Sequence, residues 1–126
     1  MSRIFLILLM HVIGDFFLQG EKLRKNKAYT LASLSLHIFI YTSVFIICCP
    51  FLLGMSFKQA VIYALINGFT HLIIDFYFRK LKLGYANFNQ NKYRLVLFID
   101  QLLHLIILYV SYLLLFPQGF NVEYFN

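Results

Sequence analysis

The sequence has no tryptophan, only two prolines and only five acidic residues among 126. Charged residues make up 13% of the chain, whereas hydrophobic residues make up 61% and the mean hydropathy is +0.76. A soluble domain of this length cannot bury so much apolar surface, because small folds bury a limited fraction of their area. The composition therefore predicts a single integral membrane domain over residues 1–126. Without tryptophan, tyrosine and phenylalanine would have to supply the aromatic residues at the membrane interfaces.

Several sequence features of other protein classes are missing. There is no CxxC pair, no GxSxG and no glycine-rich nucleotide-binding loop. The two cysteines, Cys48 and Cys49, are adjacent, so we do not expect a disulfide framework. Residues 1–19 have a basic start and an apolar run, but no small-x-small cleavage site follows. We therefore expect this segment to be retained and not removed as a signal peptide.

Four apolar runs predict an all-α bundle of four transmembrane helices. They cover about residues 3–19, 28–49, 57–78 and 95–116. None of the runs shows the alternation of a strand, and a helix satisfies its own backbone hydrogen bonds in lipid. The second helix is expected to end before Pro50 and the fourth before Pro117.

Basic residues gather in the loops that follow the first and third runs. They are Lys22, Arg24, Lys25 and Lys27 in the first loop, and Arg79, Lys80, Lys82, Lys92 and Arg94 in the second. The opposite side carries only Arg3 and Lys58. The positive-inside rule then predicts that both basic loops are cytoplasmic and both termini are outside. Since the net charge of +6 lies beside apolar runs, we expect lipid headgroups as its partner and no nucleic acid.

Three of the five acids lie four residues from a histidine. The pairs are His11 with Asp15, His71 with Asp75, and Asp100 with His104. Residues four apart share a helix face. The order of the pair reverses in the last helix, which runs the other way, so the levels match across the bundle. Together with His37, the pairs predict a histidine layer roughly 12–16 Å from the basic loops, with the carboxylates nearer to those loops.

Ionisable side chains are costly in a bilayer, so these groups should face the bundle interior. Three clustered carboxylates need a positive charge among them, which a divalent metal would supply. The seven candidate ligands are His11, Asp15, His37, His71, Asp75, Asp100 and His104. Four further polar residues would support them: Gln19, Asn67, Arg79 and Gln101. Zinc is the preferred ion, with iron and manganese as alternatives, and the ligands suffice for one ion or two. An ion pair between Arg79 and Asp75 is a purely structural alternative.

At these residues the sequence resembles a bacterial membrane family known as domain of unknown function 3307. The resemblance is carried in order by HVIGDFFLQ (11–19), HLIID (71–75) and DQLLH (100–104), and the last motif is the most specific. It implies a small four-helix protein of the bacterial cytoplasmic (inner) membrane and supports the site without implying a reaction. The sequence is also similar in style to inner-membrane metal-dependent hydrolases. The echo between the first two motifs suggests a parallel two-helix repeat.

Three interpretations follow. The first is a membrane-embedded metal-dependent hydrolase that acts on a lipid or another amphiphile from the cytoplasmic side, with Asp15, Asp75 and Asp100 as candidate catalytic residues. The second is proton or metal-ion transport through the same residues in a homo-oligomer. The nearly apolar segments beyond the histidines favour a one-sided cavity over such a path. The third is a structural or signalling subunit whose polar layer locks the bundle.

Overall fold

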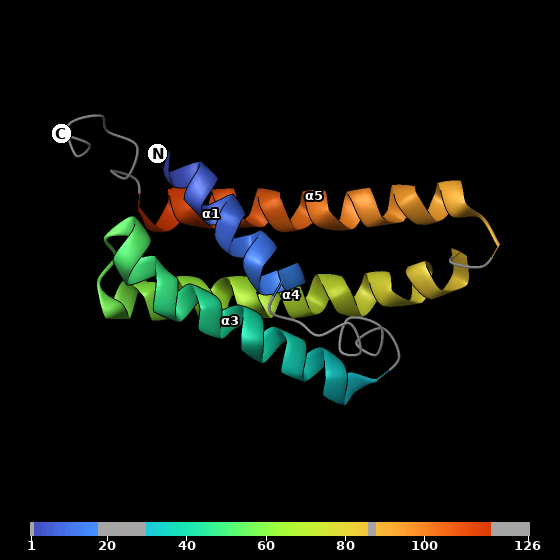
Figure 1. Ribbon diagram of the computed structural model, residues 1–126, viewed down its shortest axis with the longest axis horizontal. Helices are drawn as coiled ribbons and strands as arrows, with labels where there is room; N and C mark the ends of the chain where they lie inside the picture. The colour runs from blue at the N-terminus through green and yellow to red at the C-terminus, as the bar shows by residue number, and fades with distance from the viewer. Residues whose placement is uncertain (1, 18–29, 86–87, 117–126) are drawn as a thin grey trace.

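The computed structural model describes residues 2–17, 30–85 and 88–116, and every regular element in these ranges is helical. In chain order they are α1 (Arg3–Val12), the π-helical turn η1 (Ile13–Phe17), α3 (Leu31–Leu53), α4 (Phe57–Tyr85) and α5 (Gln90–Leu115). The helix α4 runs antiparallel to both α3 and α5, and the shorter α1 lies across the bundle against α3 and α5 (Figure 1). The predicted all-α bundle is confirmed.

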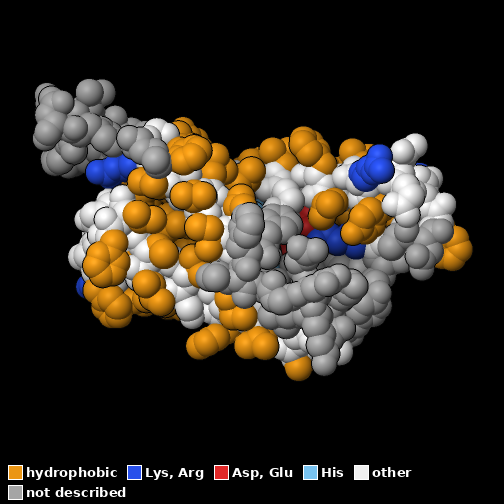
Figure 2. All heavy atoms as spheres, viewed as in Figure 1, with side chains coloured by type: hydrophobic (Ala, Val, Ile, Leu, Met, Phe, Trp, Pro, Cys, Tyr) orange, Lys and Arg blue, Asp and Glu red, His pale blue; other side chains and the backbone are white. Residues whose placement is uncertain are grey.

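Three of the described helices are long and apolar enough to cross a membrane, over Leu31–Leu53, Phe57–Lys82 and Gln90–Leu115. Large apolar side chains cover their outer surfaces, including Phe39 and Phe51, which are 70% and 87% exposed. Figure 2 shows apolar side chains spread over much of the visible face. Such a surface is stable in lipid and not in water, so the protein is a helical membrane protein.

The second helix differs from its predicted range of 28–49. It begins at Leu31 and continues through Pro50 to Leu53 instead of ending before the proline. Pro50 lies in the last turn, where the missing N–H removes one hydrogen bond without disrupting a long stretch of helix. The helix ends at Gly54, whose φ of 67° is the left-handed conformation that glycine adopts without a steric penalty.

The other helices also differ at their ends. The first predicted helix, residues 3–19, is helical as far as Phe17, and its last two residues lie outside the described ranges. The third helix extends beyond residue 78 to Tyr85, and the fourth begins at Gln90. The side chain of Asn89 caps the fourth helix by accepting a backbone N–H. Polar residues thus extend two helices past the apolar runs that predicted them.

Aromatic side chains fill the bundle toward the end where α1 starts and α5 finishes (Figure 1). Phe45 and Tyr63 are fully buried, and the Tyr63 hydroxyl donates to the Leu108 carbonyl at 2.9 Å. The Arg3 guanidinium donates to the Tyr112 hydroxyl at 2.7 Å and so joins the start of α1 to the end of α5. These two helix ends therefore lie at the same end of the bundle. The side of the membrane that this end faces stays a prediction.

The helices α3 and α4 approach each other closely at Gly68. A Cβ atom placed on Gly68 would overlap the Thr42 Oγ1 atom and lie 3.4 Å from the Thr42 Cβ atom. Small residues permit this kind of close helix contact in membranes. The contact lies one residue from Asn67, whose side chain donates to the Ser111 hydroxyl at 3.1 Å and joins α4 to α5.

We predict that Gly68→Ala lowers the thermal midpoint of the detergent-solubilised protein. The added methyl group must push α3 and α4 apart or displace Thr42, and overpacking of this kind costs about 1–3 kcal/mol of unfolding free energy. Gly84→Ala is the matched control, because a Cβ atom there meets nothing within 4 Å. Equal midpoints for the two variants would show that the close contact does not constrain the bundle.

Candidate metal centre

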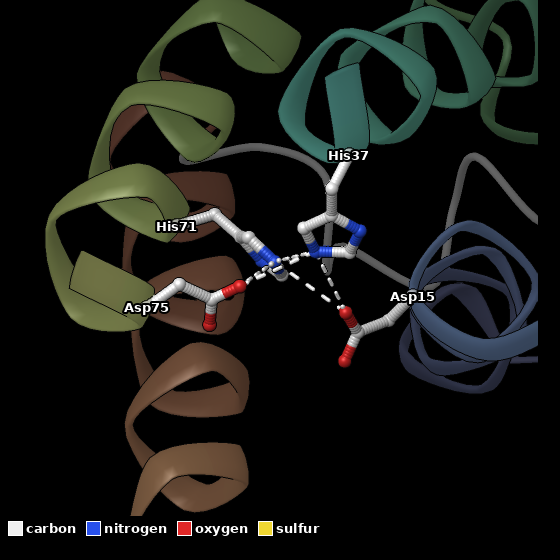
Figure 3. A group of neighbouring side chains, drawn as sticks. All are labelled: Asp15, His37, His71 and Asp75. Carbon is white, nitrogen blue, oxygen red and sulfur yellow. Dashed lines mark hydrogen bonds and ion pairs between the residues drawn. The ribbon is translucent and has the colours of Figure 1, made fainter. Parts of the chain in front are cut away.

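Four buried side chains from three segments converge on one point. Asp15 comes from η1, His37 from α3, and both His71 and Asp75 from α4. Their exposed fractions are 1%, 0%, 1% and 5% in that order. Figure 3 shows that their polar ends face one another. We call these four residues the His–Asp quartet.

Five distances among the facing atoms of the quartet are close to those between the ligands of one tetrahedral metal ion. The Nε2 atoms of His37 and His71 are 2.8 Å apart. His37 Nε2 lies 3.1 Å from Asp15 Oδ1 and 3.3 Å from Asp75 Oδ2. His71 Nε2 lies 3.5 Å and 3.3 Å from the same two oxygens. Nitrogen and oxygen ligands of a tetrahedral zinc ion, at about 2.0–2.1 Å from the metal, lie about 3.3–3.4 Å from one another. The observed spacings bracket this value.

The carboxylate of Asp75 faces a second group of side chains with its other oxygen. Asp75 Oδ1 lies 3.4 Å from His104 Nε2. His104 Nδ1 donates to the backbone carbonyl of Asp100 at 2.7 Å, and since a carbonyl only accepts, this nitrogen carries a proton. Asp75, Asp100 and His104 each offer an atom within 4.8 Å of the others. We call these three residues the Asp100 group; it shares Asp75 with the quartet.

Lys82 neutralises one carboxylate of this group. Its ammonium forms an ion pair with Asp100 Oδ2. Asp100 is fully buried, whereas the Lys82 side chain is 17% exposed. Lysine commonly buries its aliphatic stem and places its ammonium at a polar site, and here that site is an internal carboxylate.

A directed hydrogen-bond chain supports Asp15 from the side opposite the quartet. The Gln101 amide donates to Asp15 Oδ2 at 3.2 Å, which turns Gln101 Oε1 toward His11 Nε2 at 3.0 Å. An amide oxygen only accepts, so His11 Nε2 is the donor, and a neutral His11 accepts from the Tyr41 hydroxyl at its Nδ1, 2.9 Å away. The chain occupies Asp15 Oδ2 and leaves Asp15 Oδ1 directed at the two histidines of the quartet.

The π-helical turn changes the direction of the Asp15 side chain relative to His11, although His11 Nε2 still lies 3.9 Å from Asp15 Oδ2. In an α-helix, residues four apart stack on one face, but a π turn contains more residues and rotates the following side chains. Asp15 lies within η1, just after α1 ends at Val12. Its Oδ1 therefore reaches the quartet while His11 faces Tyr41 and Gln101. Single π turns are common at functional sites.

The imidazole rings of the quartet are also held by packing. The His71 ring stacks on the Tyr41 ring, with centroids 4.1 Å apart, and the His37 and His71 centroids are 4.9 Å apart. Among the residues that the structure describes, the Nδ1 atoms of His37 and His71 have no hydrogen-bond partner. In most metal sites, a hydrogen bond to the second ring nitrogen fixes the orientation of a histidine ligand. Here, stacking on the Tyr41 ring positions His71 instead.

Comparison with known proteins identifies the family. One family profile, described as "Protein of unknown function (DUF3307)", matches residues 4–126. The chain belongs to this family. Membership confirms the resemblance carried by the three sequence motifs. No curated protein and no solved structure matches the chain. The similarity to inner-membrane hydrolases stays a prediction.

In this DUF3307 protein, six of the seven predicted ligands lie in the quartet or in the Asp100 group. The seventh, His11, belongs to neither, because Tyr41 and Gln101 hold both of its ring nitrogens. The repeated HVIGD and HLIID motifs therefore have different roles. The aspartates of both motifs belong to the quartet, but of the two histidines only His71 belongs to it.

The four predicted supporting residues are dispersed. Gln101 contacts Asp15, as described above. Asn67 lies in a separate polar contact with Ser111. The Arg79 guanidinium lies over the Phe76 ring at 4.3 Å from its centroid. Gln19 lies outside the described residues.

Sequence reasoning missed the role of Lys82, which it placed among the loop cations. A signal was present, because Lys82 follows Asp75 by two helical turns and so shares its face. Tyr41 follows His37 by four residues, which places the two side chains on one helix face. Its contacts with His11 and His71 depend on how α1 and α4 pack against α3, which a single helix pattern does not contain.

We predict that Tyr41→Phe destabilises this DUF3307 protein more than Tyr77→Phe. Removal of the Tyr41 hydroxyl leaves His11 Nδ1 buried without its donor, a loss of about 1–3 kcal/mol. Tyr77 also lies on a membrane helix but is 69% exposed, so it is a matched control. Thermal unfolding in detergent measures both variants. Equal midpoints would mean that the chain from Tyr41 to Asp15 contributes nothing to stability.

Proposed function

We propose that the protein is a membrane-embedded metalloenzyme in which the His–Asp quartet holds one divalent cation. The observation that carries this proposal is the convergence of two Nε2 atoms and two carboxylate oxygens, all buried, at tetrahedral spacing. Two nitrogens at 2.8 Å beside two carboxylates form an unfavourable arrangement unless a proton or a cation lies among them.

The charges support a divalent ion. Asp15, Asp75 and Asp100 carry three negative charges when ionised, and Lys82 supplies one positive charge in direct contact with Asp100. Two negative charges are left, and one divalent cation among neutral imidazoles balances them. In a low-dielectric interior such balance matters far more than it does in water.

Zinc is the ion that we propose, because two imidazoles and two carboxylates at tetrahedral spacing suit it. Iron and manganese accept the same ligand types and are the alternatives.

The reaction that this site supports best is hydrolysis. A divalent cation held by the four quartet ligands would have to accept water as a fifth ligand, and it would then activate that water and polarise the bond under attack. Asp15 and Asp75 would hold the ion, and Gln101 would keep Asp15 turned toward it. Asp100 is the carboxylate outside the quartet, and its Oδ2 atom contacts the Lys82 ammonium. An ionised carboxylate beside the site can accept a proton, so we assign that role to Asp100.

The substrate that we propose is a lipid or another amphiphile that enters from the end of the bundle that carries the basic residues. Figure 2 shows acidic and basic side chains next to each other, with apolar side chains beside them. Toward the opposite end, Tyr41, Phe45 and Tyr63 are at most 1% exposed and fill the bundle. A site that substrate could enter from this end alone would suit an enzyme better than a transport path. With the positive-inside rule, this entrance would face the cytoplasm of a bacterial inner membrane.

We predict that the detergent-solubilised protein, stripped with a chelator and dialysed against zinc, binds one zinc ion per chain by elemental analysis. His71→Ala removes a ligand, and the affinity should fall by more than about 100-fold, beyond the range of an outer-shell change. His11→Gln is the matched control, because His11 supports Asp15 from outside the quartet. It should keep one ion and lose at most about 10–100-fold in affinity.

Two results would contradict the metal centre. One is a wild-type protein that takes up no zinc at saturating concentration. The other is a His71→Ala variant with wild-type affinity. Either result would mean that protons on the histidines balance the carboxylates, as the structural-subunit interpretation requires.

We further predict that the zinc-loaded protein, reconstituted in phospholipid vesicles, releases hydrolysis products detectable by mass spectrometry. His71→Ala should abolish release, and Asp100→Asn should lower its rate by about 10²–10⁴-fold, the usual contribution of a proton acceptor. Tyr77→Phe is the control with an exposed change. Zinc or proton flux across the vesicles without product release would reject hydrolysis in favour of transport.

A further inference from the structure

We infer that the Lys82 ammonium fills a second cation position, formed by Asp75, Asp100 and His104, and thereby limits this site to one divalent ion. The inference rests on the proposed metal centre, which supplies the first ion. Beyond the first ion, we infer a second position that could bind a metal ion if the Lys82 ammonium did not occupy it.

The first support is the ligand geometry of the Asp100 group. Its three residues are 5%, 0% and 3% exposed, and each offers a ligand atom within 4.8 Å of the others. The proton on His104 Nδ1 is held by the Asp100 carbonyl, so the remaining nitrogen, Nε2, is the one directed at Asp75 Oδ1. Two carboxylates and an imidazole nitrogen are ligands that a divalent transition metal accepts.

The second support is the way Asp75 joins the two positions. Its Oδ2 faces His37 and His71, and its Oδ1 faces His104. A carboxylate that directs one oxygen to each of two ligand sets is the arrangement that bridges two metal ions in helix-bundle carboxylate sites. The backbone therefore places ligands for two cations side by side.

The third support is the position of Lys82. Its ammonium contacts Asp100 Oδ2, inside the Asp100 group, from a point two turns along α4 from Asp75. A tethered ammonium carries one charge where a second divalent ion would carry two. With Lys82 in place, one divalent ion balances the three carboxylates, and a second would leave a buried excess of positive charge. Without Lys82, both a ligand set and a negative charge become available.

The experiment is equilibrium dialysis of the full chain in detergent against a rising concentration of zinc, with elemental analysis. The variants are Lys82→Met and Lys82→Gln, and Lys80→Met is the matched control, because Lys80 is an exposed lysine on the same helix. We expect one zinc per chain for wild type and Lys80→Met, and two for the Lys82 variants. Adding Asp100→Asn to Lys82→Gln should return the ratio to one.

The outcomes separate the two proposals. If wild type binds one ion and a folded Lys82 variant also binds one, the inference is wrong while the metal centre stands. If wild type already binds two, Lys82 does not exclude the second ion and the inference is wrong. If wild type binds none, the metal centre itself fails. Lys82→Gln keeps a side chain that can hydrogen-bond to Asp100, so it serves where Lys82→Met does not fold.

Discussion

Neutralising three carboxylates inside an apolar bundle is the constraint on which the rest of the structure depends. Asp15, Asp75 and Asp100 are each at most 5% exposed, and an isolated charge at such depth is costly. In the bundle, imidazoles, the Lys82 ammonium and the Gln101 amide surround these carboxylates. The helix α4 is central because it carries both His71 and Asp75 and also Lys82. The aromatic packing toward the other end then closes the polar layer from that side.

The fold was predictable because the hydropathy runs are long and the chain has few alternatives in lipid. The helix ends were less so. A proline stops most helices, but Pro50 lies in a last turn that tolerates it, and Gly54 sets the end instead. The extensions of α4 to Tyr85 and of α5 back to Gln90 are rich in lysine, arginine and other polar residues, so the hydropathy of the chain does not predict them. Capping by Asn89, not burial, defines that boundary.

The part of the candidate site that could be predicted is the set of acids that lie one helical turn from a histidine. Buried acids four residues from histidines had to face inward, which brought Asp75 and His71 together. The role of His11 could not be predicted, because a π turn after Val12 directs Asp15 Oδ1 at the quartet and leaves only Asp15 Oδ2 near His11. No residue type in IGDFF specifies such a turn. The reach of Lys82 to Asp100 was hidden for another reason, because a flexible cation near a loop usually points to headgroups or water.

The order of the quartet ligands along the chain has a consequence for biogenesis. Asp15 leaves the ribosome early, at the end of a helix shorter than an ordinary bilayer span, whereas His71 and Asp75 follow much later on α4. Until α4 is inserted, the Asp15 carboxylate has neither of these partners, and until α5 follows, α1 lacks one of the two helices that it contacts. Quality control that senses an undocked first helix would therefore discriminate complete from incomplete chains without inspecting the site itself.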